Sequence, residues 1–313
     1  MTRLPFLSWG APLVEARFVH RPNRFVVHAH VEGEGEVVAH LADPGRLREL
    51  LVPGRRVGLR PEPASPTRST RWTALLVESA DGGGWVSVNT TMPNLLVRRA
   101  LADGALEEFA GWRLGRWEVP FGDSRLDFLL EGPEGGRLYV EAKSVTLVED
   151  GVALFPDAVT ARGARHLEEL VRAVGEGHEA AVLFVLQRTD ARRIVAARSI
   201  DPVFADALAA AAQAGVRVLG RRCSVTWEGI GLGERVEAGV GFAQELADET
   251  GASLTEAVTE VLRERLATVR VAPAGDLLDA EVAEIQAFVA SLPDRDPRSA
   301  EEILGYDDFG LPG

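Results

Sequence analysis

The chain has 313 residues and a formal net charge of −13, and 46% of its residues are hydrophobic while 26% are charged. This balance is typical of a globular protein, and the length favours two domains with an appendage. The first twenty residues carry Arg3, Glu15 and Arg17 between short apolar stretches, and later runs are shorter than a membrane span, so we expect a cytoplasmic protein with no membrane partner. The one cysteine, Cys223, excludes an internal disulfide and a cysteine-based metal cluster.

The negative charge is concentrated at the C-terminal end. Residues 1–90 carry a net charge of +2, residues 91–235 carry −3, and residues 236–313 carry −12. The first 235 residues are therefore nearly balanced, and their arginines can still line a groove that binds nucleic acid.

The first ninety residues predict a small β-barrel domain, which we place at residues 1–90. Short runs rich in strand-forming residues, separated by glycine and proline turns, cover residues 13–20, 24–31, 36–41, 55–59, 72–78 and 85–89. A helical insert is expected at residues 45–51, after the turn Asp43-Pro44-Gly45. Five or six short strands fit a five-stranded oligonucleotide-binding (OB) barrel, although other small barrels fit this count too.

Residues 91–236 predict a mixed α/β domain. Helical spacing covers residues 94–108, 160–174 and 202–214, and strand-like runs cover residues 113–119, 125–130, 137–148, 180–187, 216–227 and 230–235. The run at residues 180–187 is almost entirely apolar, which predicts a central strand buried on both faces. We therefore expect an α-β-β-β-α-β core.

Residues 237–313 predict an acidic, α-helical tail. Helices are expected at residues 236–250, 254–269 and 277–292, and Ser253 with Glu256 forms a capping box at the start of the second one. Apolar stripes beside dense acid favour a protein partner over nucleic acid. The alternative is a helical hairpin that packs back on the α/β domain.

The distribution of lysine indicates a chemical site. The chain has 34 basic side chains, and Lys143 is its only lysine. An ammonium is a compact point charge, whereas a guanidinium is a planar fork, so a lone lysine suggests a position where arginine cannot substitute. Glu141 lies two residues earlier, and on a strand this spacing places both side chains on one face.

A second acid completes the predicted site. Asp127 lies on the preceding predicted strand, so a hairpin through residues 131–136 would bring Asp127 and Glu141 to one cation. Such oxygen ligands suit Mg²⁺ or Mn²⁺, and Lys143 would then position a water or stabilise charge on a phosphate. An acid on one strand and Glu-x-Lys on the next resembles the PD-(D/E)xK nuclease superfamily, in which Glu118 would be an additional acid. The alternative is a pair of salt bridges on a strand surface, because short motifs also arise by chance.

Longer motifs carry a more specific resemblance. They are Asn23-Arg24-Phe25, Asp43-Pro44-Gly45-Arg46 within residues 39–51, Pro93-Asn94-Leu95, Gly122-Asp123-Ser124-Arg125-Leu126-Asp127-Phe128, Glu141-Ala142-Lys143-Ser144-Val145-Thr146-Leu147, and Arg162-Gly163-Ala164-Arg165-His166 within residues 155–167. In this order they resemble the bacterial sugar fermentation stimulation protein family from about residue 10 to residue 236. The resemblance implies an N-terminal OB-type barrel, a nuclease-like domain, and DNA binding with a regulatory role in sugar metabolism.

Several side chains are candidates for DNA contacts. Arg162 and His166 are four residues apart on a predicted helix, so both can face the Asp127 and Glu141 site or a phosphate backbone. For the predicted contacts Asn23, Arg24 and Arg46, ordinary turn chemistry and solvent exposure are the competing explanations. Phe25, Trp72 or Trp85 could stack on unpaired bases, with packing in the barrel as the alternative. The full set of predicted DNA contacts is Asn23, Arg24, Arg46, Arg125, Arg162 and His166.

The tail resembles a second family. Residues 246–258 and 292–307 are similar to antitoxins that partner PIN-domain ribonuclease toxins. Such antitoxins usually begin with a strand that reads DNA as a dimer, whereas residues 230–237 here continue the preceding segment, so we do not expect the tail to bind an operator. The resemblance implies a fusion, natural or from a frameshift, with a PIN-domain toxin as partner.

These observations favour a DNA-binding protein with a nuclease-like metal site. An active Mg²⁺-dependent nuclease is the alternative, since Asp127, Glu141 and Lys143 are all present. Toxin binding by the tail is compatible with both, and a homodimer is left open.

Overall fold

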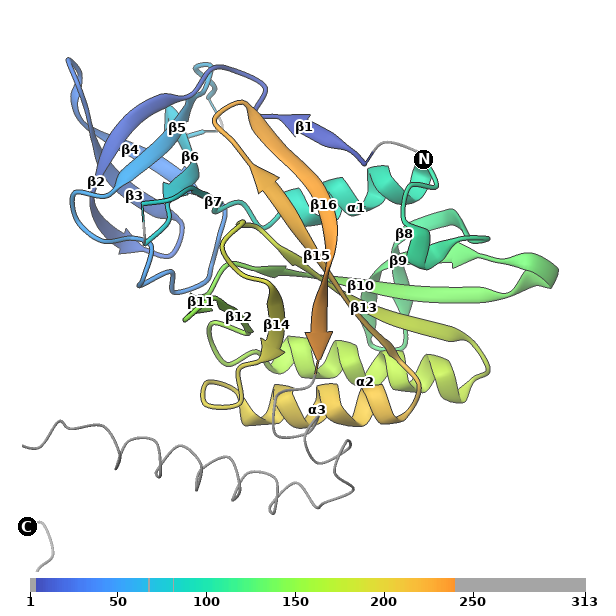
Figure 1. Ribbon diagram of the computed structural model, residues 1–313. Coiled ribbons are helices and arrows are strands. Elements are labelled where there is room, and N and C mark those ends of the chain that lie inside the picture. Colours follow the sequence, from blue (N-terminus) through green and yellow to red (C-terminus); the bar gives the residue numbers. More distant parts are fainter. Residues whose placement is uncertain (1–3, 67, 81, 240–313) are drawn as a thin grey trace, which may run out of the picture. The chain divides into compact units, whose positions relative to one another are not determined.

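The computed structural model describes residues 4–66, 68–80 and 82–239 (Figure 1). The tail helices expected at residues 254–269 and 277–292, and the capping box of Ser253 and Glu256, lie outside these residues. The first tail helix was expected to begin at Val236, but residues 236–239 belong to strand β16 (Gly229–Gly239). They are strand because Val236 pairs with Gly220 and Glu237 pairs with Arg193, on the two neighbouring strands.

The N-terminal domain is a closed five-stranded barrel of the OB type. Its strands run in the order β4-β3-β2-β5-β6, and parallel pairing of β4 with β6 closes the barrel. A further short strand, β7, pairs antiparallel with β6. Val27, Ala29 and Val31 on β3 point into the barrel core, and the residues between them face outward, as alternating strand residues must. The strands are β2 (Val14–Asn23), β3 (Val26–Val31), β4 (Gly35–Leu41), β5 (Arg56–Pro61), β6 (Trp72–Glu78) and β7 (Trp85–Ser87).

The helix expected at residues 45–51 is wrong. The segment makes a single turn, in which the Leu51 N–H donates to the Leu47 carbonyl at 2.8 Å, and Leu47 has a left-handed φ of 48°. The Arg21 guanidinium donates to the carbonyls of Gly45 and Arg46 at 2.7 and 2.9 Å. A helix would need those same carbonyls as acceptors within its first turn, so the arginine holds the segment as a loop.

The second domain is built on a ten-stranded mixed sheet with the order β11-β12-β14-β16-β15-β13-β10-β9-β8. The tenth strand, β1, pairs with β16, so the start of the chain belongs to this sheet and not to the barrel. The longer strands confirm the sequence prediction, whereas β1, β11, β12 and β14 were not predicted. The remaining bounds are β1 (Phe6–Ser8), β8 (Arg113–Phe121), β9 (Ser124–Glu131), β10 (Arg137–Val145), β11 (Val148–Glu149), β12 (Val152–Phe155), β13 (Glu179–Leu186), β14 (Arg193–Ala196) and β15 (Arg217–Val225).

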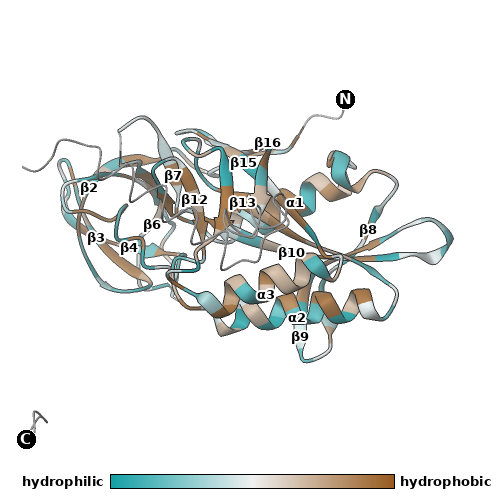
Figure 2. Ribbon diagram, turned by 60° about the horizontal axis from the view of Figure 1, so that its bottom comes forward, coloured by the Kyte–Doolittle hydropathy of each residue, from teal (hydrophilic) through white to brown (hydrophobic). Residues whose placement is uncertain are grey.

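Helices cover both faces of this sheet, with α1 (Met92–Ala102) on one face and α2 (Ala161–Gly175) and α3 (Pro202–Gln213) side by side on the other (Figures 1 and 2). Thr160 caps α2 by accepting the Gly163 N–H at 3.0 Å, and Asp201 caps α3 in the same way. Two apolar cores, one per face, share β13, whose residues after Glu179 are all buried as expected. Two short 3₁₀ turns complete the domain, at Glu107–Phe109 and Pro133–Gly135.

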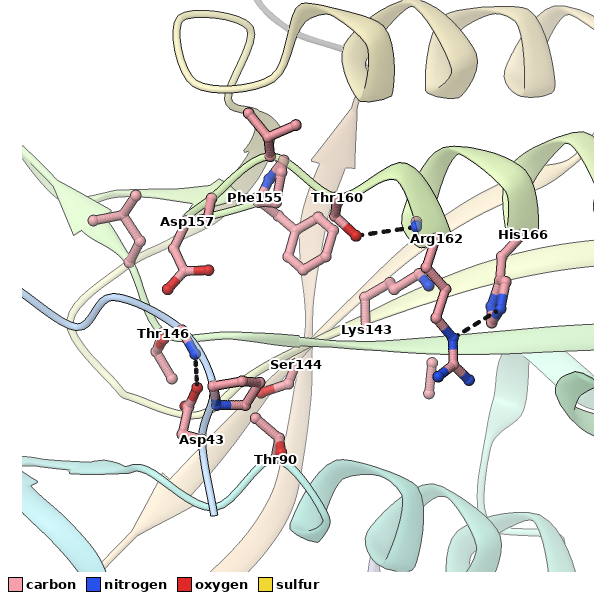
Figure 3. A pocket seen from close by; sticks show the side chains of 18 of the residues that line it. Asp43, Thr90, Lys143, Ser144, Thr146, Phe155, Asp157, Thr160, Arg162 and His166 are labelled. Carbon is pink, nitrogen blue, oxygen red and sulfur yellow. Dashed lines mark hydrogen bonds between the residues drawn. The ribbon is translucent and has the colours of Figure 1, made fainter. Parts of the chain in front are cut away.

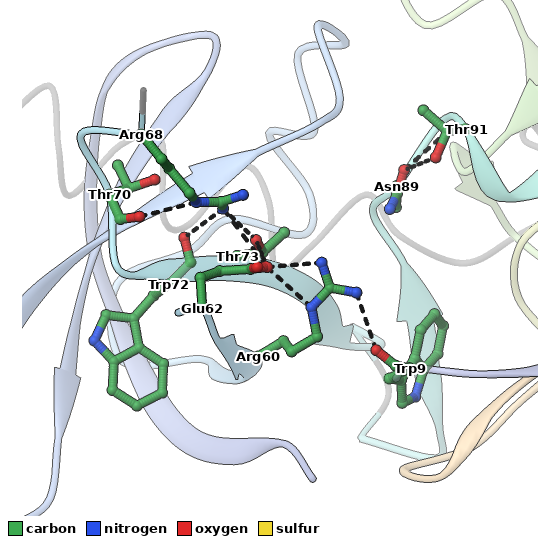
Figure 4. A network of polar contacts seen from close by, with 9 residues as sticks. All are labelled: Trp9, Arg60, Glu62, Arg68, Thr70, Trp72, Thr73, Asn89 and Thr91. Atoms are coloured by element: carbon green, nitrogen blue, oxygen red, sulfur yellow. Dashed lines mark hydrogen bonds and ion pairs between the residues drawn. The ribbon is translucent and has the colours of Figure 1, made fainter. Parts of the chain in front are cut away.

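Polar contacts join the barrel to the α/β domain. Figure 4 shows Arg60 on β5, which donates to Glu62 at 2.7 Å and to the Trp9 carbonyl at 3.0 Å. Trp9 in turn donates through its indole N–H to the Thr226 carbonyl at 3.0 Å in the α/β domain.

Among the described residues, no helix is long and apolar enough to cross a membrane.

Candidate metal and nucleic-acid site

The predicted hairpin is present and ends at the site. Strands β9 and β10 pair antiparallel up to Val140 and Phe128, and then the backbones separate. Beyond that pair, the Asp127 carboxylate accepts the Ala142 N–H at 2.8 Å, and the Glu141 carboxylate accepts the Asp127 N–H at 3.3 Å. Each carboxylate therefore takes a backbone donor from the opposite strand, which fixes both acids where the strands part.

Glu141 is held by two further side chains. The Lys143 ammonium donates to Glu141 Oε1 at 2.8 Å, and His166 Nδ1 is hydrogen-bonded to the same oxygen. Arg162 Nε donates to His166 Nε2 at 3.2 Å, so Nε2 is the acceptor and Nδ1 carries the proton that faces Glu141. Glu141, Lys143 and His166 are all buried, at 3%, 9% and 4% exposure. The predicted Glu-x-Lys pair is thus a buried, directly bonded pair and not a surface salt bridge.

Asp127 is held by a residue that we did not assign to the site. Asn94, in the first turns of α1, donates through its side-chain amide to Asp127 Oδ1 at 2.8 Å. The sequence marks Asn94 only as part of the motif Pro93-Asn94-Leu95. Its role depends on a contact between a helix and a strand 33 residues apart, which spacing alone cannot reveal.

The two carboxylates have shifted pKa values of opposite sign. Burial, followed by the charge of Glu141, raises the pKa of Asp127 to about 6. Burial also raises the pKa of Glu141, but the hydrogen bond from His166 and the charge of Lys143 outweigh it and leave that pKa below its ordinary value. At neutral pH both acids are therefore ionised beside one ammonium. Two fixed, ionised oxygen ligands with residual negative charge fit a hard divalent cation.

The site opens into a cavity of about 560 Å³ between the barrel and the α/β domain (Figure 3). Lys143, Arg162 and His166 lie at one end, and Asp43 and Asp157 lie at the other.

The barrel loop that carries Asp43 is fixed to the α/β domain. Asp157 Oδ2 accepts the Arg46 N–H at 2.9 Å, and a Cβ on Gly45 would lie 2.3 Å from the same oxygen, so a larger residue here would have to displace the Asp157 carboxylate. Burial raises the pKa of Asp43 to about 6.

The predicted DNA contacts separate into two groups. Arg24 and Arg162 line this cavity together with the two carboxylates, and both are exposed. Asn23, Arg46 and Arg125 are exposed but are not among its lining residues, and the Asn23 side chain instead accepts the Phe25 N–H at 2.9 Å as an ordinary turn residue. His166 is buried against Glu141, so its ring offers no surface to DNA and serves to hold the carboxylate.

Glu118 does not join the carboxylate pair. It lies on β8 with a left-handed φ of 51°, its side chain is 69% exposed, and it forms an ion pair with Arg125 at 3.5 Å. It lines a second cavity, which adjoins the first at Asp127.

Two of the predicted base platforms pack within the protein. The Trp85 ring lies 5.0 Å from the ring of Trp227, and Trp72 packs against the barrel core. Phe25 is 45% exposed beneath Arg24, so it stays available as a platform. Trp117, which no sequence motif marks, is 55% exposed beside the site.

Two family models match the barrel and the α/β domain. Residues 19–88 match the model described as the SfsA N-terminal OB domain, and residues 91–229 match the sugar fermentation stimulation protein RE domain. A sugar fermentation stimulation protein homolog from Moorella thermoacetica is 47% identical over 215 residues, which span 69% of this chain and 91% of the relative. The chain belongs to the sugar fermentation stimulation protein family. A family member from Chloroflexus aurantiacus is 44% identical over 243 residues, or 77% of this chain and 91% of that protein.

A solved member of the family has the same fold. The structure of Pyrococcus furiosus SfsA in complex with Ca²⁺ superposes with a TM-score of 0.67 at 28% identity, covering 76% of this chain and all of that one. This confirms the OB-type barrel followed by an α/β domain. Residues 238–312 match a separate model, described as an Rv0623-like transcription factor, which agrees with a tail that does not belong to the sugar fermentation stimulation segment.

Proposed function

We propose that this family member binds DNA and holds a divalent cation between Asp127 and Glu141. The observation that carries the proposal is the pair of carboxylates, Glu141 buried and Asp127 half-buried, fixed by opposite strands and opposed by the single ammonium of Lys143. The family relative solved with Ca²⁺ supports a hard cation, and the same oxygen ligands suit Mg²⁺ or Mn²⁺.

The arginines around the cavity support the DNA partner. Arg24 comes from the barrel and Arg162 from α2, and both side chains reach the cavity that contains the carboxylates. Arginine binds phosphate with its planar fork, and OB barrels commonly bind oligonucleotides. A DNA strand lying between the two domains would meet both arginines and the cation. Binding without cleavage would suit a cytoplasmic regulatory protein.

A second candidate function is hydrolysis of phosphodiester bonds, favoured by the position of Lys143. A cation at the carboxylates would polarise a phosphoryl oxygen and acidify a bound water. Lys143 holds a buried ammonium 2.8 Å from Glu141 Oε1, where it can donate to that water or to a phosphate oxygen. His166 and Asn94 keep Glu141 and Asp127 in place, so the ligands need little reorganisation when substrate binds.

One experiment separates these functions. Single- and double-stranded DNA and RNA are incubated with Mg²⁺, Mn²⁺, Ca²⁺ or EDTA, and binding and cleavage are measured for the wild type, Asp127→Ala and Lys143→Ala. Cleavage in Mg²⁺ or Mn²⁺ that both variants lose would establish the nuclease. Salt-sensitive DNA binding without cleavage would support the regulatory protein. A wild type that binds no DNA under any of these conditions would contradict the proposal.

For the tail, we propose binding of a PIN-domain ribonuclease toxin. The resemblance of residues 246–258 and 292–307 to such antitoxins, together with the acidity and predicted apolar stripes of the tail, supports this. Co-purification of the full chain with such a toxin, and inhibition of its ribonuclease activity, would test it, with Leu304→Asp as the disrupted tail. Light scattering of the same samples reports whether the chain forms a homodimer.

A further inference from the structure

An exposed tryptophan lies beside the carboxylate site. Trp117 on β8 is 55% exposed, and its backbone pairs with Phe128, the residue after Asp127. The guanidinium carbon of Arg98, on α1, lies over the indole, 5.2 Å from the ring centroid. The arginine thus holds the ring in a fixed orientation while more than half of the side chain stays open to solvent.

Trp117 forms one wall of a cavity of about 320 Å³, which is separate from the larger cavity but adjoins it. Leu95 and Arg98 of α1 line the same cavity, together with Asp127. Asp127, Asn94 and Thr90 line both cavities, so the two meet at the carboxylate that we assign to the cation. Ligand pockets usually begin at about 300 Å³, so this cavity is large enough for one base.

The surroundings of the ring indicate what it binds. A half-exposed indole beside a cavity offers apolar surface that a ligand can cover. Arg98, Arg116 and Arg125 are all exposed on or near β8 and α1, and Glu118 is the acid that pairs with Arg125. A flat apolar surface among arginines matches a ligand that alternates flat rings with negative charge. Single-stranded nucleic acid has this chemistry, and it binds such surfaces by stacking bases on aromatic rings.

We propose that the Trp117 cavity binds one unpaired base of the DNA strand whose phosphate lies at Asp127 and Glu141. This inference rests on the proposed DNA binding and makes it more specific. The base would stack on Trp117 and pack against Leu95, with the Arg98 guanidinium beside the indole. A base in a duplex must first leave its stack, so single-stranded, frayed or mismatched DNA is preferred over intact duplex.

The test uses single-stranded oligonucleotides in which one abasic position is moved along the strand. Ca²⁺ is present to occupy the carboxylate site, and affinity is measured by fluorescence anisotropy. For the wild type, we expect one abasic position to weaken binding about tenfold or more, and the others to have little effect. Trp117→Ala should weaken binding of the unmodified strand by a similar factor and should no longer respond to the abasic position. Trp117→Phe should retain most of the response.

Two additions exclude indirect effects. Val203→Ala removes another exposed apolar side chain, 66% exposed on α3, and should bind like the wild type. A 2-aminopurine base at the sensitive position should lose fluorescence on binding to the wild type and keep it with Trp117→Ala. Thermal unfolding of each variant confirms that the fold is intact.

The outcomes distinguish this inference from the function on which it rests. If Trp117→Ala binds like the wild type and no abasic position matters, while binding still requires Asp127, then base stacking is refuted and the proposed DNA binding stands. If Trp117→Ala changes only self-association, the face is a contact between copies and the inference also fails. If the wild type binds no DNA, both are wrong.

Discussion

Asp127 and Glu141 are fixed by exchanged backbone donors: Asp127 accepts the N–H of the residue that follows Glu141, and Glu141 accepts the N–H of Asp127. A buried acid, Glu141, and a half-buried acid, Asp127, are thereby held close together beside the ammonium of Lys143. This arrangement should lower the free energy of unfolding of the metal-free protein, because like charges held close together repel. A cation would relieve the repulsion, so stability and metal binding are linked.

Asp127→Asn should stabilise the metal-free protein. The pKa of Asp127 is about 6 in the fold against an ordinary 3.8, so the fold favours the uncharged form, and the free energy of unfolding should rise by about 1–3 kcal/mol at pH 7. The Asn94 amide can flip to pair with the new amide group. Urea unfolding in EDTA measures the change, with Asp103→Asn, an exposed acid paired with Arg99, as the control near zero. If Asp127→Asn were less stable than the wild type, the charge of Asp127 would not destabilise the metal-free fold.

Affinity for Ca²⁺ should fall as the pH drops through about 6. Protons compete with the cation for Asp127, so each pH unit below that pKa should weaken binding up to about tenfold. The free energy of unfolding of the metal-free protein should change in the opposite direction. Ionised Asp127 destabilises the fold above pH 6, and this destabilisation is relieved as the pH falls from 6 toward 4. Calorimetry at pH 5, 6 and 7.5 tests this. Asp43 has a similar pKa but lies at the other end of the cavity, so Asp43→Asn should keep the dependence.

Lys143→Met should separate cation binding from chemistry. The ammonium lies 2.8 Å from Glu141 Oε1, so its removal leaves more negative charge for a cation, and we expect tighter Ca²⁺ binding. If the wild type cleaves DNA, this variant should lose at least about a hundredfold in rate, as when other donors to a developing charge are removed. Calorimetry and a cleavage assay on the same samples provide the comparison. Weaker Ca²⁺ binding would mean instead that Lys143 mainly positions Glu141.

Arg21→Ala should unfold the barrel loop that borders the cavity. The guanidinium donates to four carbonyls, those of Arg24, Asp43, Gly45 and Arg46, at 2.7–2.9 Å. Loss of these bonds should lower the free energy of unfolding by about 2–3 kcal/mol. Arg17→Ala is the matched control, because Arg17 makes one longer bond of 3.2 Å, to the Gly54 carbonyl, and should change stability little. Equal effects of the two substitutions would contradict a special role for Arg21.

The sequence predicts the parts of the fold that local pattern controls. The alternation of apolar and polar residues predicts the barrel strands. Two β-rich runs with a glycine turn between them predict the β9–β10 hairpin, so the proximity of Asp127, Glu141 and Lys143 could be predicted from the sequence. Strands β11, β12 and β14 are too short to show a period. The loop at residues 45–51 and the roles of Asn94 and Trp117 depend on contacts across the fold, with Arg21, Asp127 and Arg98 respectively. Such contacts leave no trace in spacing.

DNA binding by this protein should require a cation held by Asp127 and Glu141. The most direct measurement is the anisotropy of a labelled single-stranded oligonucleotide titrated with wild type or Asp127→Ala, in Ca²⁺ and in EDTA. We predict tight, Ca²⁺-dependent binding by the wild type and weak, Ca²⁺-independent binding by the variant. Equal binding by both proteins in both buffers would contradict the account.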